Sequence, residues 1–234
     1  MFYNFTSVTN IKFGYINTEN MTSMSQMFRN CKKLSKLDVD DFNTSKVTSM
    51  YETFLYCSNL IELDSSNWNT SKVTSMYNMF NGCKQLTNLD VSNWDTSKVT
   101  SMYLMFQGCS NILELNVSNW DVSSVKNMTH LFSGCKSLTE LDVSNWKTSS
   151  ATTMYAMFQS CSGLTTLDLR NFDTRGVTDM ALMFRYSSKL KSIYVGKNWI
   201  IPENNVGMFD VCPTKNAEQL CYPNSTHEWC VVSN

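Results

Sequence analysis

The chain has 234 residues with a formal net charge of -1, and 42% of its residues are hydrophobic. This charge leaves no basic excess to neutralise a phosphate backbone, which argues against a nucleic-acid-binding protein. Charged residues make up only 17%, and most of the polarity comes from 30 Ser, 23 Thr and 25 Asn. The composition predicts a folded protein with an uncharged polar surface. Met1 to Phe13 lacks a signal-peptide pattern, and no apolar run is long enough to span a bilayer.

The first residues already follow a repeat of 26 residues. Met1-Phe2 stands 26 residues before Met27-Phe28, and Val8 and Ile11 occupy the positions that leucines hold in later units. The chain therefore opens in the middle of a unit. This register predicts a piece of a longer protein, and the alternative is a native start with a degenerate first unit.

Residues 1–199 are predicted to form one array of about seven units. The repeat can be written as L-x-x-L-D-V-S-N-W-D-T-S-K-V-T-S-M-Y-x-M-F-x-G-C-x-x. Cysteines mark the register most clearly, and they form a ladder that comprises Cys31, Cys57, Cys83, Cys109, Cys135, Cys161 and, after a shorter last unit, Cys212. A fixed period of this length is typical of a solenoid.

Each unit combines two hydrophobic periods. Apolar and polar residues alternate from Leu89 to Ser92, which predicts a short strand with one buried face. The steps of three and four from Val99 to Cys109 favour a helix of roughly three turns. Stacked strand-turn-helix units bury one another's apolar faces. Because helices are wider than strands, we expect an α/β solenoid resembling leucine-rich repeats, with parallel strands on its concave face.

The register breaks near the C-terminus. Ser187 takes the place of a ladder cysteine, and an insert at Ile201-Pro202 precedes the return of the motif at Cys212. Residues 200–234 are therefore predicted to be a degenerate last repeat and a C-terminal cap. Cys221 and Cys230 lie off the register. Two alternatives are open for them: a disulfide between the two, or two free thiols.

The repeat resembles the BspA-like branch of the leucine-rich-repeat proteins of bacterial surfaces and mycoplasma lipoproteins. The match rests on Leu-Asp-Val-Ser-Asn-Trp-Asp-Thr-Ser-Lys-Val-Thr-Ser-Met at 89–102 and Met-Phe-Gln-Gly-Cys at 105–109. It covers residues 1–212, although Trp94 stands where ordinary leucine-rich repeats place an asparagine. The resemblance implies surface display and adhesion or protein binding, and it supplies no catalytic residue.

The cysteine ladder is interpreted as structural. Tetrahedral thiolate sites need closely spaced cysteine pairs, and the ladder cysteines are a whole unit apart. Disulfides between neighbouring units would need shorter Cα distances than adjacent helices allow. We therefore expect buried free thiols that pack as small hydrophobic groups.

An acidic row follows the buried leucines and is the strongest candidate for a binding face. Its members would lie about 4.8 Å apart along the sheet, so their charges repel unless turn amides, hydroxyls or a cation such as Ca²⁺ offset them. A second candidate is a row of tyrosines on the other side of the unit, which could be contact residues or partly buried. The candidate residues are Asp38, Asp64, Asp90, Asp142, Asp168, Tyr77 and Tyr103.

No enzyme is predicted. His130 and His227 lie in unrelated contexts, and no phosphate loop, nucleophile elbow or metal motif is present. We expect no cofactor. The sequence predicts an extracellular or cell-surface module that binds a protein on a host or neighbouring cell, and the alternative is a structural spacer or coat component of a larger surface protein.

Overall fold

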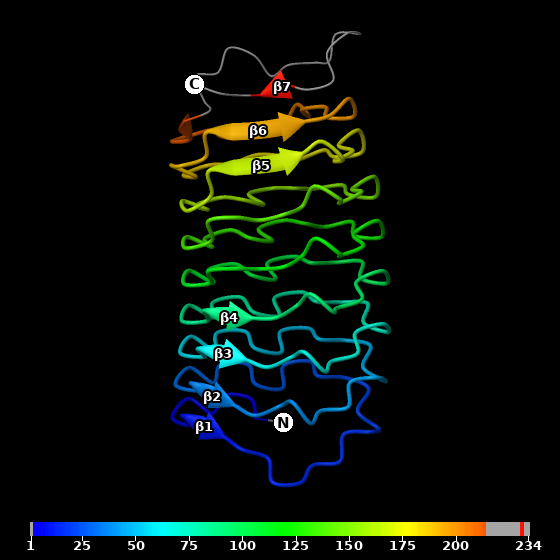
Figure 1. Cartoon of the computed structure of the whole chain (residues 1–234), viewed down its shortest axis with the longest axis vertical. Coiled ribbons are helices and arrows are strands. Elements are labelled where there is room, and N and C mark those ends of the chain that lie inside the picture. Colours follow the sequence, from blue (N-terminus) through cyan, green and yellow to red (C-terminus); the bar gives the residue numbers. More distant parts are fainter. Residues whose placement is uncertain (1, 214–229, 232–234) are drawn as a thin grey trace.

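The computed structural model describes residues 2–213 and 230–231. Similar coils stack in one column, from β1 at one end to β6 and β7 at the other (Figure 1). The described residues contain short strands and no α-helix. The strands are β1 (Asn10–Ile11), β2 (Lys36–Leu37), β3 (Glu62–Leu63), β4 (Asn88–Leu89), β5 (Thr166–Leu169), β6 (Ser192–Val195) and β7 (Cys230–Val231).

The strands lie above one another on one side of the column, and each pairs with the strand one unit away. The β3 strand pairs with β4 in parallel, with Leu63 opposite Leu89, and β5 pairs with β6 in the same way. The leucines point inward and are buried, while the residues beside them are exposed. This period of two matches the predicted parallel strands. The β7 strand pairs with β6 antiparallel.

The predicted helix is wrong. In the described units, alternate amides of this segment donate to the next unit along the stack instead of to a residue four positions earlier. Asn78 N donates to Tyr103 O at 2.9 Å, and Gly82 N donates to Gln107 O at 2.7 Å. The amides between them close tight turns, such as Cys83 N to Phe80 O at 3.0 Å. Successive turns of three and four residues therefore produce the helix-like spacing of apolar residues.

Left-handed residues explain why a helix cannot continue. Two positions of the unit have positive φ, as shown by Asn78 at 55° and Gly82 at 76°. A right-handed helix ends at such a residue, and a side chain there costs about 1–2 kcal/mol. In seven units the first position is occupied by a non-glycine residue, and Gly207 occupies it in the last described unit with φ of 65°. The seven residues are Gln26, Glu52, Asn78, Leu104, His130, Ala156 and Leu182.

A second ladder of parallel bridges joins the units on the side away from the strands. It runs through one residue of each unit, from Ser23 and Ser49 to Asp179 and Asn204. Backbone hydrogen bonds join successive units on both sides of the coil. The spacing between units is therefore not enlarged on one side, as it would be if helices packed there. The expected strand-concave curvature therefore loses its physical basis. The stack is straight in the view of Figure 1.

The core consists of identical residues stacked between units. The phenylalanines that recur every 26 residues from Phe28 to Phe184 stack nearly parallel, and Phe80 and Phe106 are 5.6 Å apart between ring centroids. Beside them the indoles of Trp94 and Trp120 stack at 6.3 Å. Each such pair is worth about 0.5–1.5 kcal/mol beyond its buried area. The interior is thus a set of columns that run the length of the molecule.

Candidate binding faces

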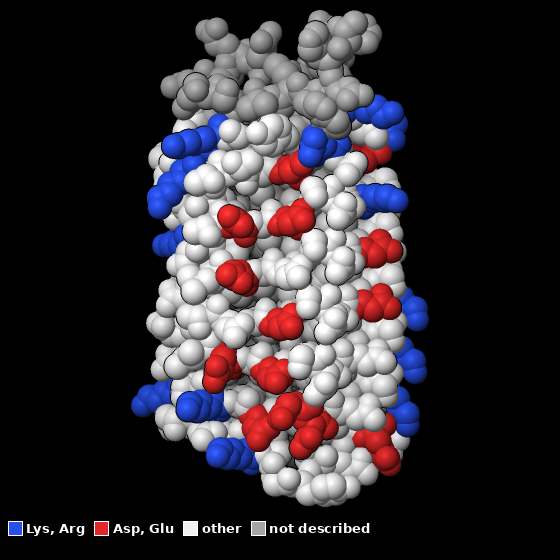
Figure 2. Space-filling view, viewed as in Figure 1, with Lys and Arg blue, Asp and Glu red and all other residues white. Residues whose placement is uncertain are grey.

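The strand face carries two rows of exposed side chains, which we call the strand-face rows. One row precedes the buried leucine and includes Glu62 and Asn88, and the other follows it and includes Asp38, Asp64 and Asp90. Acidic side chains gather along the middle of this face, with Lys and Arg at its margins (Figure 2). A hollow of about 590 Å³ lies over the first units and is lined by both rows.

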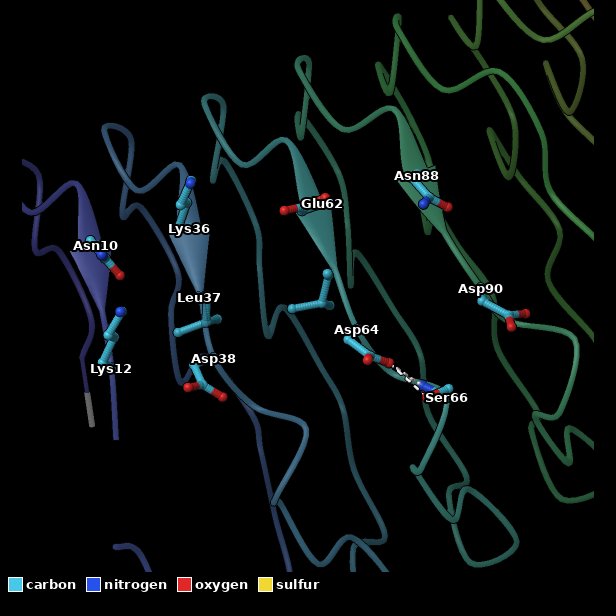
Figure 3. A pocket seen from close by; sticks show the side chains of 11 residues that line it. Asn10, Lys12, Lys36, Leu37, Asp38, Glu62, Asp64, Ser66, Asn88 and Asp90 are labelled. Atoms are coloured by element: carbon cyan, nitrogen blue, oxygen red, sulfur yellow. Dashed lines mark hydrogen bonds between the residues drawn. The ribbon is translucent and has the colours of Figure 1, made fainter. Parts of the chain in front are cut away.

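Each aspartate in the middle of the row is held by a serine two residues later. The Asp90 carboxylate accepts from Ser92 N at 2.9 Å and from Ser92 Oγ at 2.6 Å. Asp64 has the same two bonds with Ser66, drawn in Figure 3, and Asp142 has them with Ser144. These bonds fix one carboxylate oxygen and leave the other toward solvent. The side-chain and backbone hydrogen bonds from Ser92 lower the pKa of Asp90, and those from Ser66 do the same for Asp64.

The two ends of the row differ from its middle. Asp38 has no serine at this position, and a hydrogen bond with Asp40 raises its pKa. Asp168 is ion-paired with Arg170, whose Nε lies 2.8 Å from Asp168 Oδ1. Desolvation raises the pKa of Asp168, but the bonds from Arg170 outweigh it and the net pKa is lowered. The carboxylates that neither share a hydrogen bond with another carboxyl group nor form an ion pair are therefore Asp64, Asp90 and Asp142.

Within the hollow, the side chains of the two rows are stacked unit upon unit. Asp38, Asp64 and Asp90 occupy matching places on successive units, and Lys12 stands at the same place one unit before Asp38 (Figure 3). In the other row, Lys36 and Glu62 occupy matching places on neighbouring units. Neighbouring carboxylates at the spacing of parallel strands repel by about 1 kcal/mol per pair in water. Within residues 2–213 no group of His, Cys, Asp and Glu is arranged to hold a metal ion.

The ladder cysteines lie in the interior and are free thiols. Those from Cys31 to Cys161 each donate to the carbonyl of a phenylalanine in the preceding unit, as Cys109 Sγ does to Phe80 O at 3.2 Å. Cys212 Sγ instead donates to Leu190 O at 3.8 Å. Desolvation raises the pKa of Cys109 and of Cys161 to about 12. Ser187 continues the pattern, because its hydroxyl donates to Phe158 O at 2.7 Å. Ser187 is therefore a hydrogen-bonding replacement for cysteine rather than a break in the ladder.

Cys31 differs from the other ladder cysteines. A hydrogen bond with Cys57 lowers the pKa of Cys31 to about 7. Cys212 is buried as well. Cys221 and the side chain of Cys230 lie outside the described residues, so a disulfide between them and two free thiols stay alternative predictions.

The tyrosines stack on the side away from the strands. Tyr77 and Tyr103 are 4.8 Å apart between centroids, and Tyr51 stacks on Tyr77 at 5.1 Å. All three are half-buried. The rings cover one another, so they offer their edges rather than their faces to a partner. His130 lies edge-on to Tyr155 at 5.2 Å.

The sequence indicated turn amides and nearby hydroxyls as possible partners of these carboxylates, but it was not used to identify the serine two residues later. The signal was present as Asp-x-Ser at Asp64, Asp90 and Asp142. Five residues after the first two, the same spacing recurs as Asn-x-Ser at Asn69 and Asp-x-Ser at Asp95. Side chains of this type accept from the amide two residues later. Asp95 accepts from Ser97 N at 3.0 Å in this second turn. We call this second set the edge row, and its acidic members are Asp95, Asp121 and Asp173.

The fold and its rows define a repeat solenoid whose units are nearly interchangeable. Residues 1–114 and 102–220 match the family described as "Mycoplasma protein of unknown function, DUF285". The chain belongs to this family. The match agrees with the resemblance to BspA-like repeat proteins that the sequence indicated.

One similar solved structure is a leucine-rich repeat protein from Bacteroides ovatus. The two share 18% identity with a TM-score of 0.40, and the match covers 65% of this chain and 42% of that protein. This chain thus corresponds to less than half of that protein's length. No curated protein matches the chain. The described residues contain no helix with the length and hydrophobicity to cross a membrane.

Proposed function

We propose that the chain is a binding module, without catalytic activity, of a cell-surface or secreted protein. Its strand face contacts a basic segment of a protein on a host or neighbouring cell. The observation that carries this proposal is the row of exposed carboxylates at Asp64, Asp90 and Asp142, each held by a serine two residues later, with the neutral Asn116 between the last two. Stacked charges of one sign add their fields and attract a partner of opposite sign.

The interior supports a scaffold role for the rest of the unit. Thiols and threonine hydroxyls of the core bond to carbonyls of neighbouring units, and so do the indoles of Trp68, Trp120 and Trp146, as Trp146 Nε1 does to Val117 O at 3.0 Å. The Thr44 hydroxyl accepts from Asn69 N at 2.7 Å and donates to Asn69 O at 3.1 Å. The groups that could carry reactivity are thus used to join units. Membership of a repeat family agrees with an interaction module.

The test replaces three strand-face aspartates by asparagine. Asn116 already occupies this row and holds Ser118 Oγ at 2.9 Å, so asparagine fits the turn. The triple variant Asp64→Asn/Asp90→Asn/Asp142→Asn should bind an oligolysine peptide about tenfold more weakly than the unmodified chain. Its binding should also respond less to added salt, because screening acts on the charges that were removed.

The control removes the same charge from another face. Asp95→Asn/Asp121→Asn/Asp173→Asn alters the edge row, where Asn43 and Asn69 already make the same turn. This variant should lose no more than about threefold in affinity for the peptide. Equal losses in both variants would show that net charge, and not the strand face, attracts the peptide. Absence of any oligolysine binding by the unmodified chain would favour the spacer role.

A further inference from the structure

A second surface lies along the edge where each unit turns toward its strand. Its floor consists of Gly82, Gly108 and Gly134 in three successive units, all with positive φ of 72–78°. A Cβ placed on Gly108 would meet nothing nearer than the Gly82 backbone at 3.8 Å, and one on Gly134 would meet nothing nearer than the Gly108 backbone at 3.4 Å. At Gly82 the Tyr56 ring lies against the floor, because a Cβ there would be 2.6 Å from Tyr56 Cδ1. The resulting groove has a volume of about 660 Å³. We call it the glycine groove.

Lysines stand along the glycine groove in every second unit. Lys32, Lys84 and Lys136 line it and are exposed, and the units between them carry Ser58 and Ser110 at the same position. Within the described residues, none of the three lysines forms an ion pair or a side-chain hydrogen bond. Their positive charges are therefore free to meet a ligand.

The serines explain the alternation. Ser58 Oγ donates to Lys32 O at 3.2 Å, and Ser110 Oγ donates to Lys84 O at 3.3 Å. Each serine thus joins its unit to the one before and leaves space for the long lysine side chains on both sides. Since neighbouring strands are about 4.8 Å apart, lysines two units apart stand roughly 10 Å from one another. This spacing avoids the repulsion of lysines on adjacent units.

The remaining lining is neutral and polar. Asn81, Gln107 and Ser133 supply amides and a hydroxyl, Tyr56 supplies a ring that is 47% exposed, and no acidic residue lines the groove. The amide of Gly82 donates to the next unit. A peptide therefore cannot add as a further strand through that amide. Amides, hydroxyls and an aromatic ring are instead suited to a ligand rich in hydroxyl groups.

We propose that the glycine groove binds a linear anionic polysaccharide with one negative group on every second sugar. A disaccharide has about the length that separates the lysines, so successive negative groups would meet Lys32, Lys84 and Lys136. The neutral side chains between them would bond to sugar hydroxyls. This site lies apart from the strand-face rows and has the opposite charge, so its ligand differs from the basic partner proposed above.

Hyaluronan oligosaccharides test the proposal, because they carry one carboxylate on every second sugar. The variant Lys32→Gln/Lys84→Gln/Lys136→Gln should bind them about tenfold more weakly than the unmodified chain. The matched control is Lys46→Gln/Lys72→Gln/Lys98→Gln, which removes three exposed lysines from consecutive units away from the groove. It should retain binding within about threefold. Titration by calorimetry at low salt measures both.

Three results would overturn the proposal. Equal losses in the two variants would mean that positive charge anywhere on the surface is sufficient. Stronger binding of polyglutamate than of hyaluronan would identify an acidic polypeptide as the ligand. Failure of the unmodified chain to bind hyaluronan, while oligolysine binding persists, would refute the groove and leave the strand-face proposal intact.

Discussion

The residue after each buried leucine occupies the same place in every unit, yet its neighbours shift the pKa of an aspartate there in opposite directions. Asp90 is held by Ser92, which stabilises the carboxylate. Asp38 instead shares a hydrogen bond with Asp40, which favours the protonated form. One sequence position therefore has opposite pH dependence in two units, and the difference comes from the residue two positions later.

Replacing these two aspartates by asparagine should have opposite effects on stability. The lowered pKa of Asp90 means that its carboxylate stabilises the fold above about pH 4, and this contribution is lost as the pH falls. The raised pKa of Asp38 means that its contribution is lost as the pH rises, so charged Asp38 destabilises the fold at pH 7. Asp38→Asn should therefore raise the free energy of unfolding at pH 7, and Asp90→Asn should lower it by less than about 1 kcal/mol. Urea unfolding at pH 7 and pH 3 measures both, and changes of the same sign at pH 7 would contradict the assignment.

The cysteine ladder makes a second prediction at the scale of single atoms. Cys109→Ala removes the donor to Phe80 O and should destabilise the fold by about 1–3 kcal/mol. Cys109→Ser should cost less, because Ser187 makes this bond at an equivalent place. Urea unfolding compares the two variants. A serine variant less stable than the alanine variant would show that the thiol contributes through its volume and hydrophobicity alone.

At the scale of the element, the strand could be predicted from the sequence and the second half of the unit could not. Alternation around Leu89 specifies which side chains are buried, and parallel pairing follows from the fixed period. The steps from Val99 to Cys109 fit a helix as well as they fit successive turns. The distinguishing information lies in backbone bonds between units, such as Phe80 N to Met105 O, which no local period encodes.

Part of the candidate site was within reach of sequence reasoning. The strand-face aspartates follow from alternation, and their serine partners could have been found from the Asp-x-Ser spacing. The lysines of the glycine groove could have been found only by comparing every second unit, since Lys84 and Ser110 alternate with a period of two units. The ion pair that neutralises Asp168 depends on Arg170, which replaces the usual serine.

Glycine substitution distinguishes a left-handed residue from a helical one. Ala156 has φ of 52° and is buried, whereas Ala151 is equally buried without positive φ. Ala156→Gly should leave the stability unchanged or raise it, because relief of about 1–2 kcal/mol of strain offsets the lost methyl group. Ala151→Gly should cost about 1 kcal/mol. Thermal unfolding compares the two, and an equal loss at both positions would restore the helical interpretation.

At the scale of the whole molecule, the same buried thiol recurs in successive units, so the effects of the individual thiols on the pH dependence of stability add. The buried thiols Cys57, Cys83, Cys109, Cys135 and Cys161 all have raised pKa values, with desolvation as the largest or second-largest cause. In the unfolded chain they ionise near pH 8.5. The folded form therefore keeps protons that the unfolded form releases, and stability declines as the pH rises above this value.

The fold should accordingly unfold more readily at alkaline pH. Each such thiol lowers the free energy of unfolding by about 1.4 kcal/mol per pH unit once the unfolded chain is ionised. Urea midpoints between pH 8 and pH 10.5 measure the decline. The slope should decrease in Cys109→Ser, which carries one thiol fewer. A slope that does not change in this variant would show that other groups cause the alkaline loss.

The central claim is that two separate rows of side chains bind different ligands. Neither row contributes much to the stability of the fold that carries it. A crossed titration tests it, with the strand-face triple variant and the lysine triple variant each measured against oligolysine and hyaluronan. The account predicts that each variant loses only the ligand of its own row, and that both keep their melting temperatures within about 4 °C of the unmodified chain. Loss of both ligands in one variant, or a large fall in its melting temperature, would contradict the separation of binding from folding.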